Sequence, residues 1–412
     1  MNRILTLLLV GLAPLTSVYA EPWQFEASMD VATVISDQTR KVFHHLDSSG
    51  RRNIAVSSQG VVVAWEDDRD DTPRIYLAYK THDAGRFEKE VMVSGDGEAY
   101  EPSLVALTND RFVVAWEEDG HVLVRVVDFK KTVHLGPVHQ LSEKSAAQVH
   151  LTTQKEGVIA LWSERAGRYG QIRLRRVSVD STGSLRSGIG CPVDVVAPTD
   201  EQLYPSATLI NNRLVVAWED RRPKHTIIMA AVETEGEPCR FGKPERISEK
   251  PDGRNLPFGA GHGVSRVVLG RYQESGVFAA WADKRDFRDG YDIWGADFSH
   301  QERRFGSNVK VQDDFGGLSK QRHATLDGHA NGMLVVAWDD EREGHTDVAL
   351  SWLEAGEWSD DWLLPVASGE GEQSNPSIVL DENGNLHIAW VERTESGGAT
   401  RLKYAFGKLV LD

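Results

Sequence analysis

The stretch that decides the fold reads Val61-Val-Val-Ala-Trp65-Glu-Asp-Asp-Arg69, and six variants of it follow along the chain. In each variant a short, mostly apolar and β-branched run ends in a tryptophan, and an acidic residue follows one or two positions later. The seven tryptophans are Trp65, Trp116, Trp162, Trp218, Trp281, Trp338 and Trp390. They lie 46 to 63 residues apart, and a period of this size indicates a solenoid, a propeller or an array.

The residues around each repeat decide between these architectures. A turn rich in Gly or Asn precedes the repeat, and another strand precedes that turn, opening with Pro-Ser at Pro102, Pro205 and Pro376. An alternating strand follows, as at residues 74–79, and then a weaker fourth strand, as at residues 90–94. The sequence therefore predicts an all-β fold, a seven-bladed β-propeller of four-stranded antiparallel blades.

The two ends of the chain are expected to close the ring together. The last repeat supplies three strands, the third at residues 401–406, and the chain then nearly ends. A spare strand at residues 30–35 resembles the fourth strand of the other repeats. Paired with residues 401–406, it would complete the last blade and remove an exposed edge.

Residues 1–20 have the layout of a secretory signal peptide. Arg3 precedes an apolar run from Ile4 to Leu15, and a small residue, Ala20, stands before the expected cleavage site. An uncleaved membrane anchor is the alternative, but the run is shorter than the roughly 20 residues that span a bilayer. We expect residues 21–412 to form a single propeller domain in an exported protein, periplasmic or extracellular and monomeric.

The net charge and the composition limit the kinds of partner that the protein is expected to bind. The formal net charge of −16 disfavours nucleic-acid phosphates, and no compact basic run opposes it. The sequence predicts no metal and no cofactor, because no CxxC or HExxH motif occurs. Calcium is an alternative at Asp283, Asp286, Asp289 and Asp292, although a solvated acidic turn explains that stretch better.

The two cysteines are expected to form a disulfide. Cys191 and Cys239 both fall between the third and fourth strands of their repeats, in adjacent blades. Export favours oxidation. The alternative is two free, partly buried thiols.

The repeated strand-Trp-acid-Arg pattern, with Pro-Ser opening the next blade, resembles the sialidase-like, BNR-type propeller superfamily. Residues Thr81-His-Asp-Ala-Gly-Arg-Phe87 look like a degenerate Asp box, which that superfamily places between the third and fourth strands. The resemblance implies a structural role for the box, on the face away from an active site. Enzymes of the family use three arginines, a Tyr-Glu pair and an Asp, and no motif here assigns these roles to particular residues.

The acid and arginine after each tryptophan are interpreted as structural. Pairs such as Asp67 with Arg69 and Asp220 with Arg221 recur in most repeats, whereas an active site is singular. Function is therefore sought in the segments that join blades, because those segments differ and share one face around the channel.

The joining segments supply the candidate site residues. The ligand-binding candidates are Arg51, Arg52, Arg266 and Arg322, which suit a carboxylate. The candidates for proton transfer are Tyr100, Glu101, Tyr204, His262 and His323.

Three functions fit this pattern. The first is an exported module that binds a glycan or a protein at the channel face. The second is a carbohydrate-active enzyme of the sialidase superfamily, a glycoside hydrolase or lyase acting on an acidic sugar. The third is a structural module of an envelope assembly.

Overall fold

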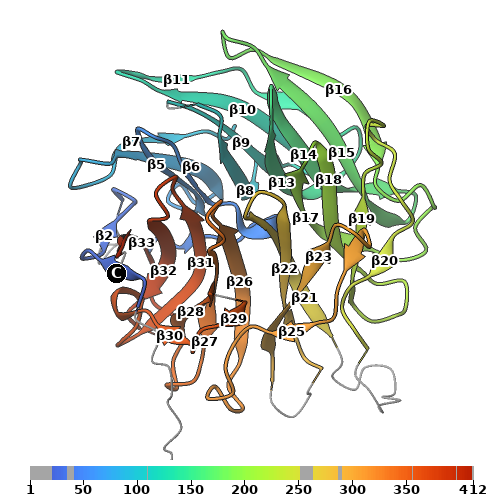
Figure 1. Cartoon of the computed structure of the whole chain (residues 1–412). Helices are drawn as coiled ribbons and strands as arrows, with labels where there is room; N and C mark the ends of the chain where they lie inside the picture. Colours follow the sequence, from blue (N-terminus) through green and yellow to red (C-terminus); the bar gives the residue numbers. More distant parts are fainter. Residues whose placement is uncertain are drawn as a thin grey trace, which may run out of the picture.

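The seven repeated tryptophans each lie in the second strand of an antiparallel sheet, and the seven sheets follow one another around a ring (Figure 1). The computed structural model describes residues 21–34, 41–108, 110–250, 263–285, 290–354, 356–395 and 397–410. The fold is a seven-bladed β-propeller, so the predicted fold class is confirmed.

The first strands of neighbouring blades contact one another around the central channel. They are β3 (His44–His45) with β4 (Ile54–Val56), β8 (Ala99–Ala106), β13 (Ala146–Gln154), β17 (Gln202–Ile210), β21 (Val264–Tyr272), β26 (Gln321–Gly328) and β31 (Glu372–Leu380). The second strands carry the tryptophans. They are β5 (Gly60–Asp67), β9 (Arg111–Glu118), β14 (Gly157–Ala166), β18 (Arg213–Asp220), β22 (Gly276–Asp283), β27 (Leu334–Asp340) and β32 (Leu386–Arg393).

The third and fourth strands form the outer part of each blade. The third strands are β6 (Arg74–Thr81), β10 (His121–Phe129), β15 (Tyr169–Val179), β19 (Ile227–Val232), β23 (Asp292–Ser299), β28 (Asp347–Glu354) and β33 (Arg401–Leu409). The fourth strands, several of them in two pieces, are β7 (Glu88–Met92), β11 (Val133–Leu135) with β12 (His139–Gln140), β16 (Leu185–Pro192), β20 (Glu245–Arg246), β24 (Arg304–Phe305) with β25 (Val309–Lys310), β29 (Glu357–Trp358) with β30 (Trp362–Leu363), and β1 (Trp23–Phe25) with β2 (Met29–Asp30).

The second strands are apolar on both faces because each blade packs between two others. All seven repeat tryptophans are at most 1% exposed, and every residue of β27 is buried. A strand buried on both sides reads as a continuous hydrophobic run rather than an alternating one.

The acid and the arginine of the repeat have a structural role: together with the tryptophan they form a hydrogen-bonded group that we name the latch. In six blades the tryptophan ring N–H donates to the carboxylate two residues later, over 2.7 to 3.2 Å. In four blades an arginine two residues further on also binds that carboxylate. In the fourth blade this partner of Asp220 is Arg222, not the expected Arg221.

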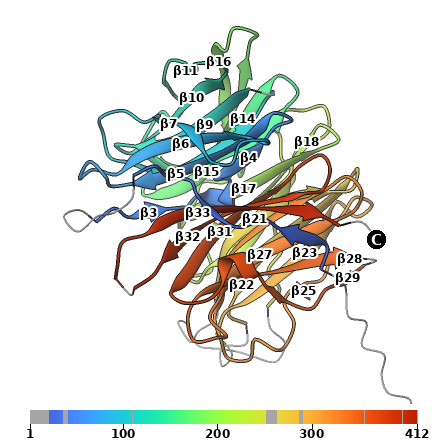
Figure 2. The same ribbon diagram turned by 90° about the vertical axis from the view of Figure 1, so that its left-hand side faces the viewer.

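The ring is closed by both ends of the chain, as Figures 1 and 2 show with the N-terminal strands in blue beside red β33. Trp23 pairs with Leu409, and Met29 pairs with Tyr404. The closing strand thus begins earlier than the predicted residues 30–35. Only Asp30 of that segment lies in a strand, Val31 still donates its amide to Leu402, and residue 35 lies outside the described residues.

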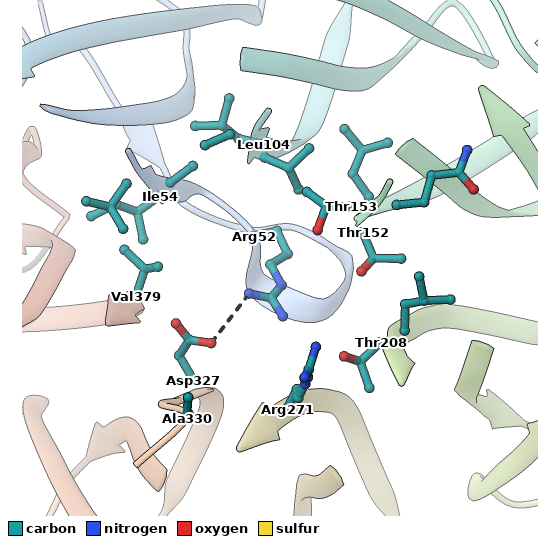
Figure 3. A pocket seen from close by; sticks show the side chains of 18 of the residues that line it. Arg52, Ile54, Leu104, Thr152, Thr153, Thr208, Arg271, Asp327, Ala330 and Val379 are labelled. Carbon is teal, nitrogen blue, oxygen red and sulfur yellow. Dashed lines mark ion pairs between the residues drawn. The ribbon is translucent and has the colours of Figure 1, made fainter. Parts of the chain in front are cut away.

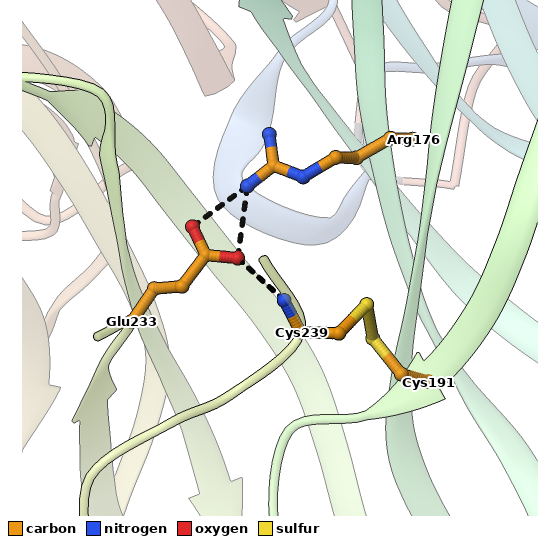
Figure 4. The surroundings of a disulfide bond; sticks show 4 residues. All are labelled: Arg176, Cys191, Glu233 and Cys239. Carbon is orange, nitrogen blue, oxygen red and sulfur yellow. Dashed lines mark hydrogen bonds and ion pairs between the residues drawn. A yellow bond between two sulfur atoms is a disulfide. The ribbon is translucent and has the colours of Figure 1, made fainter. Parts of the chain in front are cut away.

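The predicted disulfide is confirmed. Cys191, in β16 of the third blade, is bonded to Cys239 after β19 of the fourth, with 6.0 Å between their Cα atoms. Beside it, Arg176 of the third blade binds Glu233 of the fourth, and Glu233 also accepts the amide of Cys239 (Figure 4). The bridge and the ion pair therefore join the same two blades.

No helix within the described ranges is long and apolar enough to cross a membrane. The predicted signal peptide, residues 1–20, lies outside those ranges.

Candidate functional site

Six first strands contain a bulge at the same place. The pairing of these strands with their second strands shifts register over two residues. In the first blade a one-turn 3₁₀ segment, the plug (Ser49–Arg51), separates β3 from β4 at that position. Bulges re-aim side chains and are common beside active sites.

One residue at each of these positions has a left-handed backbone, with φ between 47° and 64°. We name these seven residues the bulge ring. Its members are Arg51, Glu101, Gln148, Tyr204, Arg266, His323 and Asn375. A positive φ is strained for residues other than glycine, and such strain clusters at functional sites. The seven blades therefore hold the same strained conformation at residues of six different types.

Contacts between blades show that ring side chains meet at the channel, two of them between blades that are not neighbours. Arg51 of the first blade donates from Nε to the backbone oxygen of His323 in the sixth, over 3.2 Å. Its Nη2 donates to Oδ1 of Asn375 in the seventh, over 2.9 Å. Arg266 of the fifth blade reaches Asp47 of the first, with 2.9 Å between Nη2 and Oδ2. Only side chains directed at the channel can make these contacts.

Carboxylates from the second strands hold the bulges in place. In three blades the carboxylate directly after the tryptophan accepts a hydrogen bond from the backbone N–H of the bulge-ring residue in the next blade. These are Glu117 with Gln148 (3.2 Å), Glu219 with Arg266 (2.7 Å) and Asp339 with Asn375 (2.7 Å). Such carboxylates are engaged by the backbone and serve the architecture.

Asp47 is the ionised centre of the site. It binds both Arg266 and Arg51, the latter over 3.5 Å. Burial acts to raise the pKa of Asp47, but the charges of Arg51, Arg266 and His323 outweigh it and hold the pKa below its ordinary value. Asp47 is therefore a carboxylate at neutral pH.

Glu101 behaves in the opposite way. Burial, reinforced by the charge of Asp47, raises the pKa of Glu101 to about 8. Its Oε2 atom is buried and has no hydrogen-bond partner among the described residues. Burial likewise raises the pKa of Glu66, to about 7. A protonated carboxyl beside an ionised one is the arrangement that acid–base catalysis uses.

Two further contacts complete the site. The guanidinium of Arg266 lies 3.7 Å from the centroid of the Tyr204 ring, while its Nη1 atom has no hydrogen-bond partner among the described residues. Nδ1 of His323 lies 2.6 Å from Oδ2 of Asp339. The site thus offers a guanidinium donor, a phenol, an oriented imidazole and a protonated carboxyl.

The structure brings five of the sequence candidates together at this end of the channel: Arg51, Glu101, Tyr204, Arg266 and His323. Tyr100 and Arg322 each precede a ring residue and remain paired in the sheet. The Tyr100 hydroxyl donates to Glu98, and the Arg322 guanidinium lies 5.3 Å from the centre of the Tyr291 ring. Neither is a member of the bulge ring.

Arg52 and His262 have different outcomes. The sequence groups Arg52 with Arg51 on this face, and the structure corrects that prediction. It places Arg52 at the opposite end of the channel, because the plug turns the chain between the two arginines. His262 lies outside the described residues.

Sequence reasoning missed four residues of the site: Asp47, Glu66, Gln148 and Asn375. A signal for Asn375 was present in the Pro-Ser pairs, because the residue just before the proline is Glu101, Tyr204 or Asn375. Glu66 is hard to single out, because carboxylates recur after the tryptophan. Asp47 belongs to no repeated pattern.

No group of three or more metal-ligating side chains occurs within the described ranges. The acidic stretch weighed for calcium falls partly outside them, because residues 286–289 are not described.

Comparison with known proteins supports the architecture. No protein-family model matches the sequence, and no curated protein matches it. The GH93 α-L-arabinofuranosidase of Fusarium graminearum, solved with arabinobiose, is 11% identical with a TM-score of 0.50, over 75% of this chain and 92% of that one.

Two other solved structures are similar. The β-propeller domain of the Trilobed protease from Pyrococcus furiosus is 10% identical with a TM-score of 0.50, over 90% of this chain and 99% of that one. The K499G mutant of the NanB sialidase from Streptococcus pneumoniae is 10% identical with a TM-score of 0.44, over 95% and 71%. At such identities the likeness concerns the fold, and it identifies this chain as a β-propeller.

Proposed function

We propose that this protein is an exported, carbohydrate-active propeller that binds a glycan at the bulge ring and hydrolyses a glycosidic bond there. The observation that carries the proposal is the pairing of Glu101, whose pKa burial raises to about 8, with ionised, partly exposed Asp47 in one site. Glycoside hydrolases work with two such carboxyl groups, one as acid and one as base or nucleophile.

The chemistry assigns one proton transfer to each carboxyl. Glu101 donates its proton to the glycosidic oxygen as the bond from that oxygen to the anomeric carbon breaks. A water molecule attacks the anomeric carbon, and Asp47 accepts the proton that the water loses. The sum of these steps is the addition of water across the bond.

The remaining ring residues would bind and orient the sugar. Arg266 offers its unpartnered Nη1 to a carboxylate or hydroxyl, which favours an acidic sugar. Tyr204 and His323 supply polar atoms at the edge of the same space, and Asn375 is held by Arg51. Because these side chains come from rigid strands, they require little ordering when a ligand binds.

Several features support the proposal that the protein is an exported, carbohydrate-active propeller. The Asp-box-like residues 81–87 fall between β6 and β7, where the sialidase-like superfamily has its boxes, and Phe87 packs against Tyr404. The disulfide supports export, because such bonds persist in oxidising compartments. A propeller that acts on arabinose-containing sugars is among the similar solved structures.

Glycan binding without turnover is the second candidate. It is favoured by the two ion pairs of Asp47, because a carboxylate shared by Arg51 and Arg266 is a weakened base. Both candidates place the ligand at the same ring, so a single set of variants can separate them.

The test is a panel of acidic and neutral oligosaccharides, assayed for binding and for release of reducing ends. We expect Glu101→Gln to bind substrate and to lower kcat by roughly 10²- to 10⁴-fold, the usual contribution of a general acid. The matched control is Glu98→Gln, which alters an exposed carboxyl nearby that binds Tyr100. It should leave kcat unchanged.

The other outcomes are equally informative. Binding without product from the wild type would establish the second candidate. A panel in which no glycan binds or is cleaved would refute both.

A further inference from the structure

The plug divides the channel into two ends. Ser49 donates its hydroxyl to the backbone oxygen of Pro205, and His150 contacts the backbone oxygen of Ser49 over 3.3 Å. Gly50 has a φ of +64°, and a Cβ atom there would lie 2.3 Å from the His150 ring. The plug contacts the first strands of blades two to five. Arg51, at its end, belongs to the bulge ring, whereas Arg52 lines the cavity at the far end of the channel.

A cavity of about 650 Å³ lies at the far end, and residues from all seven blades line it. Its volume is within the range of small-molecule sites. Figure 3 shows the plug loop behind this space and the arginines Arg52 and Arg271 extending into it. The hydroxyls of Thr152 and Thr208 and the side chain of Asp327 lie around them.

The cavity is cationic although the protein is strongly acidic. Arg52, Arg271 and Lys155 line it, together with one carboxylate, Asp327. The formal net charge of the whole chain is −16, so this concentration of positive charge is a local departure. Clefts lined by charge of one sign concentrate ligands of the opposite sign.

The donors of Arg52 are poorly used by the protein. Its Nη1 lies 3.9 Å from Oδ1 of Asp327, and its Nη2 reaches the backbone oxygen of Leu269 only at 3.4 Å. The other oxygen of Asp327, Oδ2, accepts the amide of Leu380 over 2.9 Å. Arg271 uses one nitrogen to bind the backbone oxygen of Glu274. Two guanidinium groups therefore converge on the cavity, and most of their N–H groups have no partner among the described residues.

We propose that this far-end cavity is a second ligand site, distinct from the bulge ring, which holds a small anionic molecule by clamping its carboxylate or phosphate group between Arg52 and Arg271. The threonine hydroxyls beside the arginines suit the hydroxyl groups of a sugar acid or a sugar phosphate. The volume admits a molecule of about mono- to disaccharide size.

The experiment titrates the full chain by calorimetry at low salt with four probes: glucuronate, glucose 6-phosphate, inorganic phosphate and neutral glucose. We expect the charged probes to bind and glucose not to bind. Comparison of glucuronate with glucose 6-phosphate identifies the preferred anion. Inorganic phosphate shows whether the charge alone is sufficient.

Three variants locate the site. Arg271→Ala removes an exposed side chain and should weaken anion binding roughly tenfold or more, as expected for a charge-assisted hydrogen bond. Asp327→Asn keeps an acceptor for Leu380 and removes the competing charge, so it should tighten binding. Arg304→Ala, an exposed arginine paired with Glu302 elsewhere, should change nothing.

The proposal is overturned if glucose binds as well as glucuronate, if no anion binds, or if Arg271→Ala binds like the wild type. It is equally overturned if Arg266→Gln at the bulge ring, rather than Arg271→Ala, abolishes anion binding. Glycan cleavage at the ring should be unchanged in Arg271→Ala, so failure here leaves the proposed function intact.

Discussion

The second strands have similar residues in every blade, whereas the bulges of the first strands have residues that differ from blade to blade. Along the second strands the blades repeat the same residues in the same role. Each has a buried tryptophan, and in six blades a carboxylate binds its ring N–H. At the bulges the blades share a backbone conformation but present different side chains. The repeated tryptophans and carboxylates therefore stabilise the propeller. The side chains that differ, held on a repeated backbone conformation, are the ones available to bind a ligand.

The seventh blade marks the limit of this rule. Its tryptophan, Trp390, has no hydrogen-bond partner for Nε1 among the described residues. This blade is completed by a strand from the other end of the chain, and Glu392, two residues after the tryptophan, does not accept the ring N–H. Even the repeated layer of the ring thus tolerates one blade without the latch.

The largest expected effect compares two aromatic residues of the fourth blade. Trp218→Ala should cost about 3–5 kcal/mol in the free energy of unfolding, because a fully buried ring leaves a cavity. Tyr204→Ala, at the bulge ring, should cost only about 1 kcal/mol, because it loses mainly the contact with Arg266. Denaturant unfolding measures both. Equal losses would remove the distinction between the two regions.

The disulfide tests whether only repeated features stabilise the propeller, because it occurs between one pair of blades and yet joins them covalently. Replacing Cys191 and Cys239 together by serine should cost about 4 kcal/mol, from the loop of 48 residues that the bond closes. Adding reductant to the wild type should reproduce that loss in the same unfolding assay. A loss below about 1 kcal/mol would mean that Arg176 and Glu233 suffice to join the two blades.

Glu101 provides the next test, through pH. Its folded pKa, about 8, exceeds the ordinary value of 4.5, so the folded state holds the proton more tightly than the unfolded state. The contribution of this group to stability is complete below about pH 4.5 and declines as the pH rises towards 8. Glu101→Gln should remove that decline and be more stable than the wild type by roughly 4 kcal/mol at pH 8.

Unfolding curves at several pH values for Glu101→Gln, Glu98→Gln and the wild type measure this effect. Glu98→Gln should follow the wild type. Parallel curves for Glu101→Gln and the wild type would show that Glu101 is ionised in the folded protein, and would remove the acid from the proposed mechanism.

The smallest effect is expected for Tyr204→Phe. The aromatic ring beneath Arg266 is retained, so the free energy of unfolding should change by less than about 0.5 kcal/mol. Glycan affinity should fall if the hydroxyl contacts the sugar. A large loss of stability with unchanged affinity would place Tyr204 with the structural tryptophans.

The fold was predictable because one sequence motif recurs seven times, and its tryptophan, turn and strand patterns all indicate a four-stranded propeller blade. The closing strand was harder to place. Its two pieces, Trp23–Phe25 and Met29–Asp30, are too short to show a period, and only their pairing with β33 defines them.

The site was predictable only in part, for reasons of geometry. Arg51 and Arg52 are neighbours in sequence, but the left-handed turn at Gly50 and Arg51 sends them to opposite ends of the channel. The pKa of Glu101 depends on its burial first, and then on the charges of Asp47 and of Arg266 from another blade, so it cannot be inferred from local sequence. What the sequence did reveal was the set of blade-joining segments, where the blades stop resembling one another.

The closure of the ring has a consequence for synthesis. Trp23 donates its ring N–H to the backbone oxygen of Gly384, a residue 361 positions later. At roughly 5–20 residues per second, the ribosome needs about 20 to 70 s to add the intervening chain. Throughout that time β1 has no partner, because the strands it pairs with do not yet exist. The final step of folding must therefore wait until the last blade has been made, and until then the growing chain presents an open edge that a chaperone can cover.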